Sequence, residues 1–170
     1  MHKRILIIGD SGRGKSTFAG KLAQRTGLPL YSTDDFYWKT KFSEPNDKAQ
    51  SISDISKVYD QESWIMEGGT RHLIEKGIPL ADKIYSLRFK YMLPQYYFLI
   101  TRKFSRKHET FANLWGLLKH VTKARYVKSY RNHKPSQLQM ISPYPEKVTH
   151  LYSLKEIKRE LESYPLTTQN

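Results

Sequence analysis

Short apolar runs alternate along the chain with longer stretches in which apolar side chains recur every three or four positions. The runs are apolar on both faces of an extended chain, as in the buried strands of a parallel sheet. The longer stretches have the spacing of amphipathic helices. Strands are predicted at residues 3–8, 28–31, 64–66, 83–89 and 147–152. Helices are predicted at 15–26, within 43–63, and at 71–76, 94–107, 113–131 and 153–163.

The order of these elements predicts the fold class. Strands that alternate with helices indicate a parallel α/β sheet, and 170 residues suit a single domain spanning 1–170. Ligands bind at the carboxyl ends of the strands in such sheets. The loops that begin at Gly9, Thr33, Glu67 and Phe89 are therefore expected to share one edge. The segment 134–146 holds three prolines and is predicted to be a loop.

The first of these loops carries a phosphate-binding pattern. Residues 9–16 read Gly-Asp-Ser-Gly-Arg-Gly-Lys-Ser and match G-x-x-x-x-G-K-[ST], the Walker A pattern. Glycines let the backbone turn its N–H groups toward phosphate oxygens, and the helix that follows adds its positive end. Lys15 is expected to reach the β- and γ-phosphates and Ser16 to coordinate Mg²⁺. The predicted nucleotide site comprises Gly9, Asp10, Ser11, Gly12, Arg13, Gly14, Lys15, Ser16 and Thr17.

The nucleotide itself is expected to be ATP. A chance match is expected roughly once in a few hundred chains of this length, and this match also follows a predicted strand and opens a predicted helix. GTPases usually carry an [NT]-K-x-D signature that reads guanine, and the sequence contains none. The predicted cofactors are therefore ATP and Mg²⁺.

Three carboxylates follow the next two strands. Asp34 and Asp35 follow the second strand, where one of them can hold Mg²⁺ through water or accept a proton from a substrate hydroxyl. The alternative for both is a capping or turn role, and Asp34 is the stronger functional candidate. Glu67 ends the third strand, where P-loop proteins often place an acid near the metal. Ser16, Asp34 and Glu67 form the predicted metal site.

The residues after Glu67 are candidates for binding the phosphate acceptor. Gly68 and Gly69 allow a ligand to approach the backbone closely, and an ordinary glycine turn after the strand is the alternative. Arg71 can hold an anionic group of the acceptor, or it is a surface arginine. Together with Asp35, these residues form the predicted substrate site.

The formal net charge of +13 lies almost entirely in one segment. Residues 83–135 contain 13 basic residues and one acid, while the rest of the chain sums to +1. Arg102 and Arg106 lie one helical turn apart, and Arg125, Lys128 and Arg131 repeat the spacing. We expect a lid over about 100–135 whose arginines neutralise charge during phosphoryl transfer, with Arg102 and Arg106 as catalytic candidates beside Lys15 and Asp34. A solvated basic helix face is the alternative.

Aromatic residues are interleaved with these basic residues. They suit stacking on adenine or on nucleic-acid bases, although most are expected to belong to the core. They are Tyr91, Tyr96, Tyr97, Trp115, Tyr126 and Tyr130. Nucleic acid is therefore a second possible partner.

Composition excludes several classes of protein. The absence of cysteine excludes disulfides, thiolate metal sites and a cysteine nucleophile. The apolar run after the basic start stops at Gly9, too soon for a signal peptide, and no segment approaches the ~20 apolar residues of a spanning helix. We therefore expect a soluble cytoplasmic protein that has no membrane partner.

Four segments resemble the small P-loop family of DNA topology modulation proteins, within the adenylate-kinase-like group. They are the strand and Walker A loop at 4–16, Thr-Asp-Asp-Phe-Tyr-Trp at 33–38, Trp-Ile-Met-Glu-Gly at 64–68 with Arg71, and Ala-Asp-Lys-Ile-Tyr at 81–85. The resemblance implies a three-layer P-loop fold, a five-stranded parallel sheet of order 2-3-1-4-5, a basic lid, ATP binding and kinase-like parts. In it, Asp34 matches the acid after the second strand and Arg71 the arginine after the third. The sequence departs from the family in having Glu67 in place of Asp, and in a longer stretch from Phe89 to Arg102.

The leading hypothesis is an ATP-dependent kinase that acts on a small molecule, a nucleotide or a nucleoside. A nucleic-acid-binding ATPase that affects DNA topology and a non-catalytic ATP-binding protein are the alternatives. The identity of the acceptor and the oligomeric state lie beyond the sequence.

Overall fold

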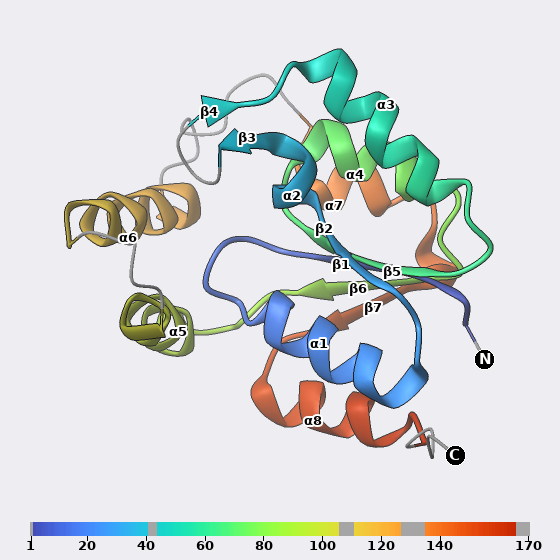
Figure 1. The fold of residues 1–170 in the computed structure, drawn as a ribbon. Helices are drawn as coiled ribbons and strands as arrows, with labels where there is room; N and C mark the ends of the chain where they lie inside the picture. The colour runs from blue at the N-terminus through green and yellow to red at the C-terminus, as the bar shows by residue number, and fades with distance from the viewer. Residues whose placement is uncertain (1, 41–43, 106–110, 127–134, 166–170) are drawn as a thin grey trace.

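The computed structural model describes residues 2–40, 44–105, 111–126 and 135–165. Five strands form a parallel sheet in the spatial order β2-β5-β1-β6-β7, which is the predicted order 2-3-1-4-5 (Figure 1). The strands are β1 (Arg4–Ile8), β2 (Leu30–Ser32), β5 (Trp64–Gly68), β6 (Lys83–Leu87) and β7 (Val148–Leu151). The predicted α/β class and sheet order are therefore confirmed.

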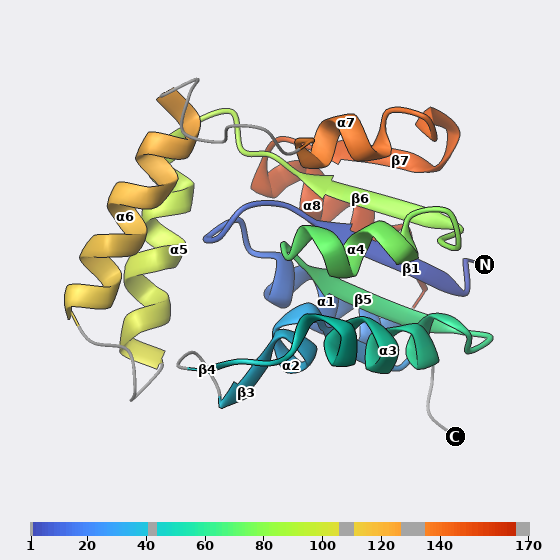
Figure 2. The same cartoon turned by 90° about the horizontal axis from the view of Figure 1, so that it is seen from above.

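Helices cover both faces of this sheet. They are α1 (Lys15–Thr26), α2 (Thr33–Tyr37), α3 (Lys48–Tyr59), α4 (Arg71–Gly77), α7 (Gln137–Ile141) and α8 (Leu154–Glu162). Helices α1 and α8 pack on one face, and α3, α4 and α7 on the other (Figures 1 and 2). Alternate residues of β1 divide between the two cores: Ile5 and Ile7 face α1 and α8, while Leu6 and Ile8 face α3 and α4.

Two further helices form a hairpin beyond the carboxyl ends of the strands. They are α5 (Met92–Ser105) and α6 (Phe111–Tyr126), and both views show them side by side and apart from the sheet (Figures 1 and 2). Leu99, Leu114 and Val121 give the hairpin a small core of its own. None of the described helices is long and apolar enough to cross a membrane.

Local sequence explains most element boundaries. Helix α1 spans the predicted residues and ends at Gly27, which adopts φ 70°. Ser153 caps α8 by accepting the backbone N–H of Glu156 at 3.2 Å. Strand β2 begins at Leu30, two residues later than predicted, because Pro29 has no N–H to donate to a ladder.

Two expectations need correction. The segment 134–146 is not all loop, because Gln137–Ile141 form α7 and Pro145–Lys147 form a 3-10 turn, η2. Ser136 and Gln139 form a capping box that starts α7, so the prolines lie outside the helix. A small antiparallel pair, β3 (Trp38–Thr40) and β4 (Glu44–Pro45), was also not predicted.

Candidate functional site

The Walker A residues form the turn between β1 and α1. Gly9, Gly12 and Gly14 have φ angles of 152°, 75° and 74°, which other residues adopt only with strain. Gly14 is the N-cap of α1, and its carbonyl accepts the N–H of Phe18 at 2.9 Å. Ser16 and Thr17 are exposed in the first turn of α1. The N-terminal end of α1 therefore begins directly at this loop, where an anion site requires it.

Lys15 lies among charged groups of the same edge. Its Nζ donates to the Asp10 carbonyl oxygen at 3.2 Å. Burial lowers the pKa of the Lys15 ammonium, while the charges of Glu67, Asp34 and Asp10 act to raise it. Carboxylates from three different segments of the chain thus influence the charge of one lysine. A bound polyanion would favour the charged form of Lys15 still further.

Glu67 is held by two serine hydroxyls. The Oγ atoms of Ser16 and Ser32 each donate to Glu67 Oε1 at 3.0 Å. Parallel pairing of β2 and β5 places Ser32 opposite Glu67, so the sheet register sets this contact. Glu67 is only 8% exposed. Sequence analysis predicted Ser16 and Glu67 but missed Ser32.

These oxygens fit Mg²⁺. The described residues contain no cluster of three or more His, Cys, Asp or Glu side chains that suits a metal ion. Mg²⁺ in nucleotide sites is usually held by one or two protein oxygens together with phosphates and water, and it prefers hard oxygen ligands. The Ser16 hydroxyl and the Glu67 carboxylate, already in contact, supply such a pair.

Asp10 and Arg13 use their side chains within the protein. Arg13 Nη2 bonds Asp10 Oδ2 at 2.9 Å, and Arg13 Nη1 donates to the Leu87 carbonyl at 3.1 Å. Arg13 is 9% exposed. These contacts fasten the loop to the end of β6, so it is the backbone of these residues that is suited to face phosphate.

Asp34 and Asp35 belong to the short helix α2 rather than to a loop. Its cap is Ser32, whose hydroxyl accepts the N–H of Asp34 at 3.3 Å, so neither aspartate serves as the N-cap. Asp34 is half-buried, and its negative charge acts to raise the pKa of Lys15, whereas Asp35 is exposed. The Asp34 carboxylate makes no hydrogen bond or ion pair with any described residue.

The glycines after Glu67 pack against the protein itself. A Cβ at Gly68 would lie 1.8 Å from Thr33 Oγ1, so glycine lets α2 rest on the end of β5. Gly69 accepts a hydrogen bond from Gln137 Nε2 at 3.2 Å. Gln137 was not singled out from the sequence, although the Ser136–Gln139 capping box would have placed it on a helix.

Arg71 begins α4 next to these glycines. Its side chain is half-buried, and no described residue makes a hydrogen bond or ion pair with it. The site thus contains one carboxylate, Asp34, which interacts with the Lys15 charge without a direct ion pair, and one guanidinium, Arg71, to which no described residue is bonded. Such groups are available to bind a second molecule beside the nucleotide.

The lid arginines can be placed only in part. Arg102 lies within α5, but its side chain is outside the described residues. Arg106, Lys128 and Arg131 lie outside them altogether, as does the side chain of Arg125. Their roles remain predictions.

The aromatic residues of this segment correct one expectation. Tyr91, Tyr97 and Trp115 are 65%, 63% and 62% exposed and are not core residues. Tyr96 is half-buried and pairs with Thr122 Oγ1 at 2.6 Å, as the core interpretation predicts. The Tyr126 side chain and Tyr130 lie outside the described residues.

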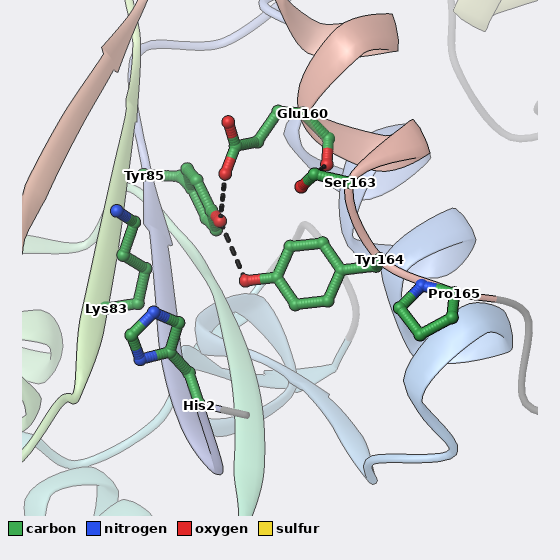
Figure 3. A pocket seen from close by; sticks show the side chains of 7 residues that line it. All are labelled: His2, Lys83, Tyr85, Glu160, Ser163, Tyr164 and Pro165. Carbon is green, nitrogen blue, oxygen red and sulfur yellow. Dashed lines mark hydrogen bonds between the residues drawn. The ribbon is translucent and has the colours of Figure 1, made fainter.

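A cavity at the other edge of the sheet contains none of the predicted site residues. It lies at Lys83, the first residue of β6, whereas the phosphate loop follows the last residue of β1 (Figure 3). Tyr85 donates to Glu160 Oε1 at 2.6 Å and pairs with the Tyr164 hydroxyl at 2.8 Å. Burial, followed by the Glu160 contact, raises the pKa of Tyr85. These bonds fasten α8 to β6, a structural role.

Comparison of the sequence with known proteins finds a partial match among curated proteins. No protein-family model matches the chain. It is 34% identical over 73 residues to the uncharacterized protein YqaC of Bacillus subtilis (strain 168), a match covering 40% of this chain and 39% of that protein. The chain thus spans well under two thirds of that relative's length.

Solved kinases share the architecture over nearly their whole length. A shikimate kinase from Bacteroides thetaiotaomicron superposes with a TM-score of 0.58 at 14% identity, covering 96% of both chains. A sugar kinase from Janibacter sp. HTCC2649 superposes with a TM-score of 0.53 at 16% identity, covering 95% of this chain and 94% of that chain. A gluconokinase from Sinorhizobium meliloti 1021 superposes with a TM-score of 0.53 at 15% identity, covering 95% of this chain and 90% of that chain. The chain therefore has the P-loop fold of these kinases.

Proposed function

We propose that this protein is an ATP-dependent kinase that transfers the γ-phosphate to a hydroxyl of a small molecule. The observation that carries the proposal is the Walker A turn between β1 and α1, where Ser16 Oγ bonds Glu67 Oε1 at 3.0 Å at the carboxyl edge of the sheet. Lys15 is the cation for the β- and γ-phosphates, and the backbone N–H groups of residues 9–17 cradle them. The acceptor binds on the side of α2 and α4.

The two carboxylates have different proposed roles, one in metal binding and the other in accepting a proton. Ser16 and Glu67 hold Mg²⁺, which neutralises charge on the phosphates when it is bound. Asp34, half-buried and without a hydrogen bond from its carboxylate to a described residue, accepts the proton as the acceptor oxygen bonds to the γ-phosphorus and the bond to ADP breaks. Asp34 beside Lys15 also suits a water-mediated contact to the metal, the alternative role predicted for it.

Arg71 suggests the chemical class of the acceptor. A half-buried guanidinium without a described partner favours an acceptor that carries an anionic group as well as a hydroxyl. Asp35, Gly68 and Gly69 are proposed to contact the acceptor on the same side. Hydroxy acids and phosphorylated sugars or nucleosides belong to this class. The arginines of the α5–α6 segment, Arg102 and Arg106, are proposed to close over the phosphates.

The test is a transfer screen with labelled ATP and Mg²⁺. The acceptors are hydroxy acids, sugars, nucleosides and nucleotides, each compared with the Lys15→Ala variant as background. Transfer to an anionic alcohol, abolished in Lys15→Ala, supports the proposal. ATP binding without transfer to any acceptor would favour the non-catalytic alternative.

A second candidate is a nucleic-acid-binding ATPase, favoured by the surface of α6. Trp115 is 62% exposed, and the Lys119 ammonium lies 5.4 Å from its ring centroid. An exposed aromatic ring beside a cation suits stacking on single-stranded bases. This function predicts salt-sensitive binding of DNA or RNA that weakens when Trp115, Lys119 and Lys123 are all replaced by alanine. Binding that is undetectable or insensitive to salt excludes it.

A further inference from the structure

The α5–α6 hairpin is joined to the rest of the molecule along one side of α5. Its own core of Leu99, Leu114 and Val121 is separate from the two cores that flank the sheet. Phe98 packs against the core on the α1 side and stacks on Phe89 at 5.9 Å between centroids. Among the described residues, Gln95 and Leu99 of α5 also approach the loop between β1 and α1, which faces α5 in Figure 2. The position of the hairpin therefore depends in part on that loop.

Gln95 makes the polar contact. It is 2% exposed, and its Nε2 donates to the Ser11 carbonyl oxygen at 2.6 Å, across 84 residues of sequence. A buried amide needs such a partner, because an unsatisfied polar group in the interior loses its hydrogen bonds to water without replacement. Gln95 and Ser11 are therefore held together in this arrangement.

Leu99, one turn further along α5, lies against Gly12. A Cβ at Gly12 would be 2.6 Å from Leu99 Cγ and 2.9 Å from the Gln95 carbonyl oxygen. The Walker A pattern does not demand glycine at this position. The close approach of α5, together with a φ of 75°, explains why glycine stands there.

Peptide geometry connects this contact to phosphate binding. In a trans peptide the carbonyl oxygen of one residue and the N–H of the next point in opposite directions. Gln95 fixes the Ser11 carbonyl toward α5, so the Gly12 N–H points to the other side of the loop. An N–H held on that side needs no reorientation before it meets an anion.

We propose that Gln95 is a positioning residue that orients the Ser11–Gly12 peptide for phosphate and couples nucleotide binding to docking of the α5–α6 hairpin. The inference rests on the proposed function in one respect, that this loop binds nucleotide. Coupling is reciprocal: if the docked hairpin favours the nucleotide-binding loop, bound nucleotide favours the docked hairpin by the same factor.

The first test measures the Kd of Mg–ATP for two isosteric variants, relative to wild type at each pH. Gln95→Leu removes the donor, and we expect about fivefold to tenfold weaker binding. Gln95→Glu places a charged carboxylate against the Ser11 carbonyl oxygen at pH 8, and because two acceptors repel each other we expect at least about 30-fold weaker binding. The carboxyl regains a donor when protonated, and burial raises its pKa, so this deficit should shrink toward pH 6.

The matched control is Gln50→Leu on α3. Gln50 is exposed and its amide bonds Asp54 at 2.8 Å, so the same substitution there is expected to leave ATP affinity unchanged. Wild-type affinity in Gln95→Leu overturns the proposal. A deficit in Gln95→Glu that does not change with pH also overturns it, because a merely structural role would give that result.

Hydrogen exchange of the wild-type chain gives a second test that does not depend on the variants folding. A non-hydrolysable ATP analogue with Mg²⁺ should slow exchange at residues 9–16 and also at residues 111–126. Protection of the loop without protection of α6 overturns the coupling and leaves the proposed function standing. Protection at neither segment overturns the proposed function itself.

Discussion

On the phosphate-loop side of the site, the polar side chains are bonded to one another. Glu67 accepts two serine hydroxyls, and Arg13 pairs with Asp10. On the side of α2 and α4, Asp34 and Arg71 make no such contacts with described residues. A bonded network fixes one geometry before a ligand arrives, which suits a part that every ATP meets in the same way. Charged groups that make no direct hydrogen bond within the protein keep their donor and acceptor atoms for a ligand, which suits the part that selects an acceptor.

The largest effect is expected from removing the cation that both sides share. Lys15→Ala should lower kcat/KM by about 10³-fold or more, because the charge at the β- and γ-phosphates is lost. Transfer assays and ATP titration measure this. Lys21→Ala on the exposed face of α1 is the control and should retain activity. Equal losses in the two variants would refute a specific role for Lys15.

Asp34→Asn should lower kcat by about 10²–10³-fold, since general-base catalysis typically contributes that much. The Kd for ATP should change little, because the amide keeps the shape of the carboxylate. Asp60→Asn, an exposed aspartate after α3, provides the comparison. If Asp34→Asn instead weakens Mg–ATP binding and leaves kcat unchanged, Asp34 contacts the metal and is not the general base for the acceptor hydroxyl.

Arg71→Ala should raise the KM for the acceptor by about 10–100-fold, corresponding to loss of a charge-assisted contact of about 1.5–3 kcal/mol. Steady-state kinetics with an acceptor from the screen measures this, and ATP affinity should be unchanged. Lys76→Ala, an exposed cation on the same helix, controls for net charge. An unaltered KM for an anionic acceptor in Arg71→Ala would remove Arg71 from the site.

The smallest effect concerns pH. Burial lowers the pKa of Lys15 in the free protein, and a bound triphosphate favours its charged form, so ATP binding should take up a proton at alkaline pH. Affinity should then fall as pH rises through the free-protein pKa, by up to about tenfold per pH unit. Calorimetry in buffers of different ionisation enthalpy measures the uptake. Lys15→Arg stays charged and should show none.

Local sequence was enough to predict the phosphate loop and helix α1. The glycines, the lysine and the apolar face of Phe18, Ala19 and Leu22 lie within one short segment, so their pattern does not depend on distant contacts. The sheet order also agreed with the resemblance to a known family. Helix α7 was missed because its flanking prolines suggested a loop, although the Ser136–Gln139 capping box was visible in the sequence.

The partners of these residues could not be predicted in the same way. Ser32 meets Glu67 only because β2 and β5 pair in one register. Gln137 reaches Gly69 and Gln95 reaches Ser11 across 68 and 84 residues. No local pattern distinguishes these glutamines from exposed ones such as Gln50. The exposure of Tyr97 and Trp115 likewise depends on how α5 and α6 pack.

The sequence by itself determined that this chain has a loop with the Walker A pattern after the first strand of a parallel sheet and a strongly basic segment after the fourth sheet strand. Both are properties of short stretches, set by glycine conformation, hydrophobic spacing and charge. Tertiary structure decided which polar groups are satisfied, as in Ser16–Glu67–Ser32, and which charges stay available, as in Asp34 and Arg71. Hydrogen bonding between distant residues depends on strand register and helix packing, and these form only when the whole chain folds.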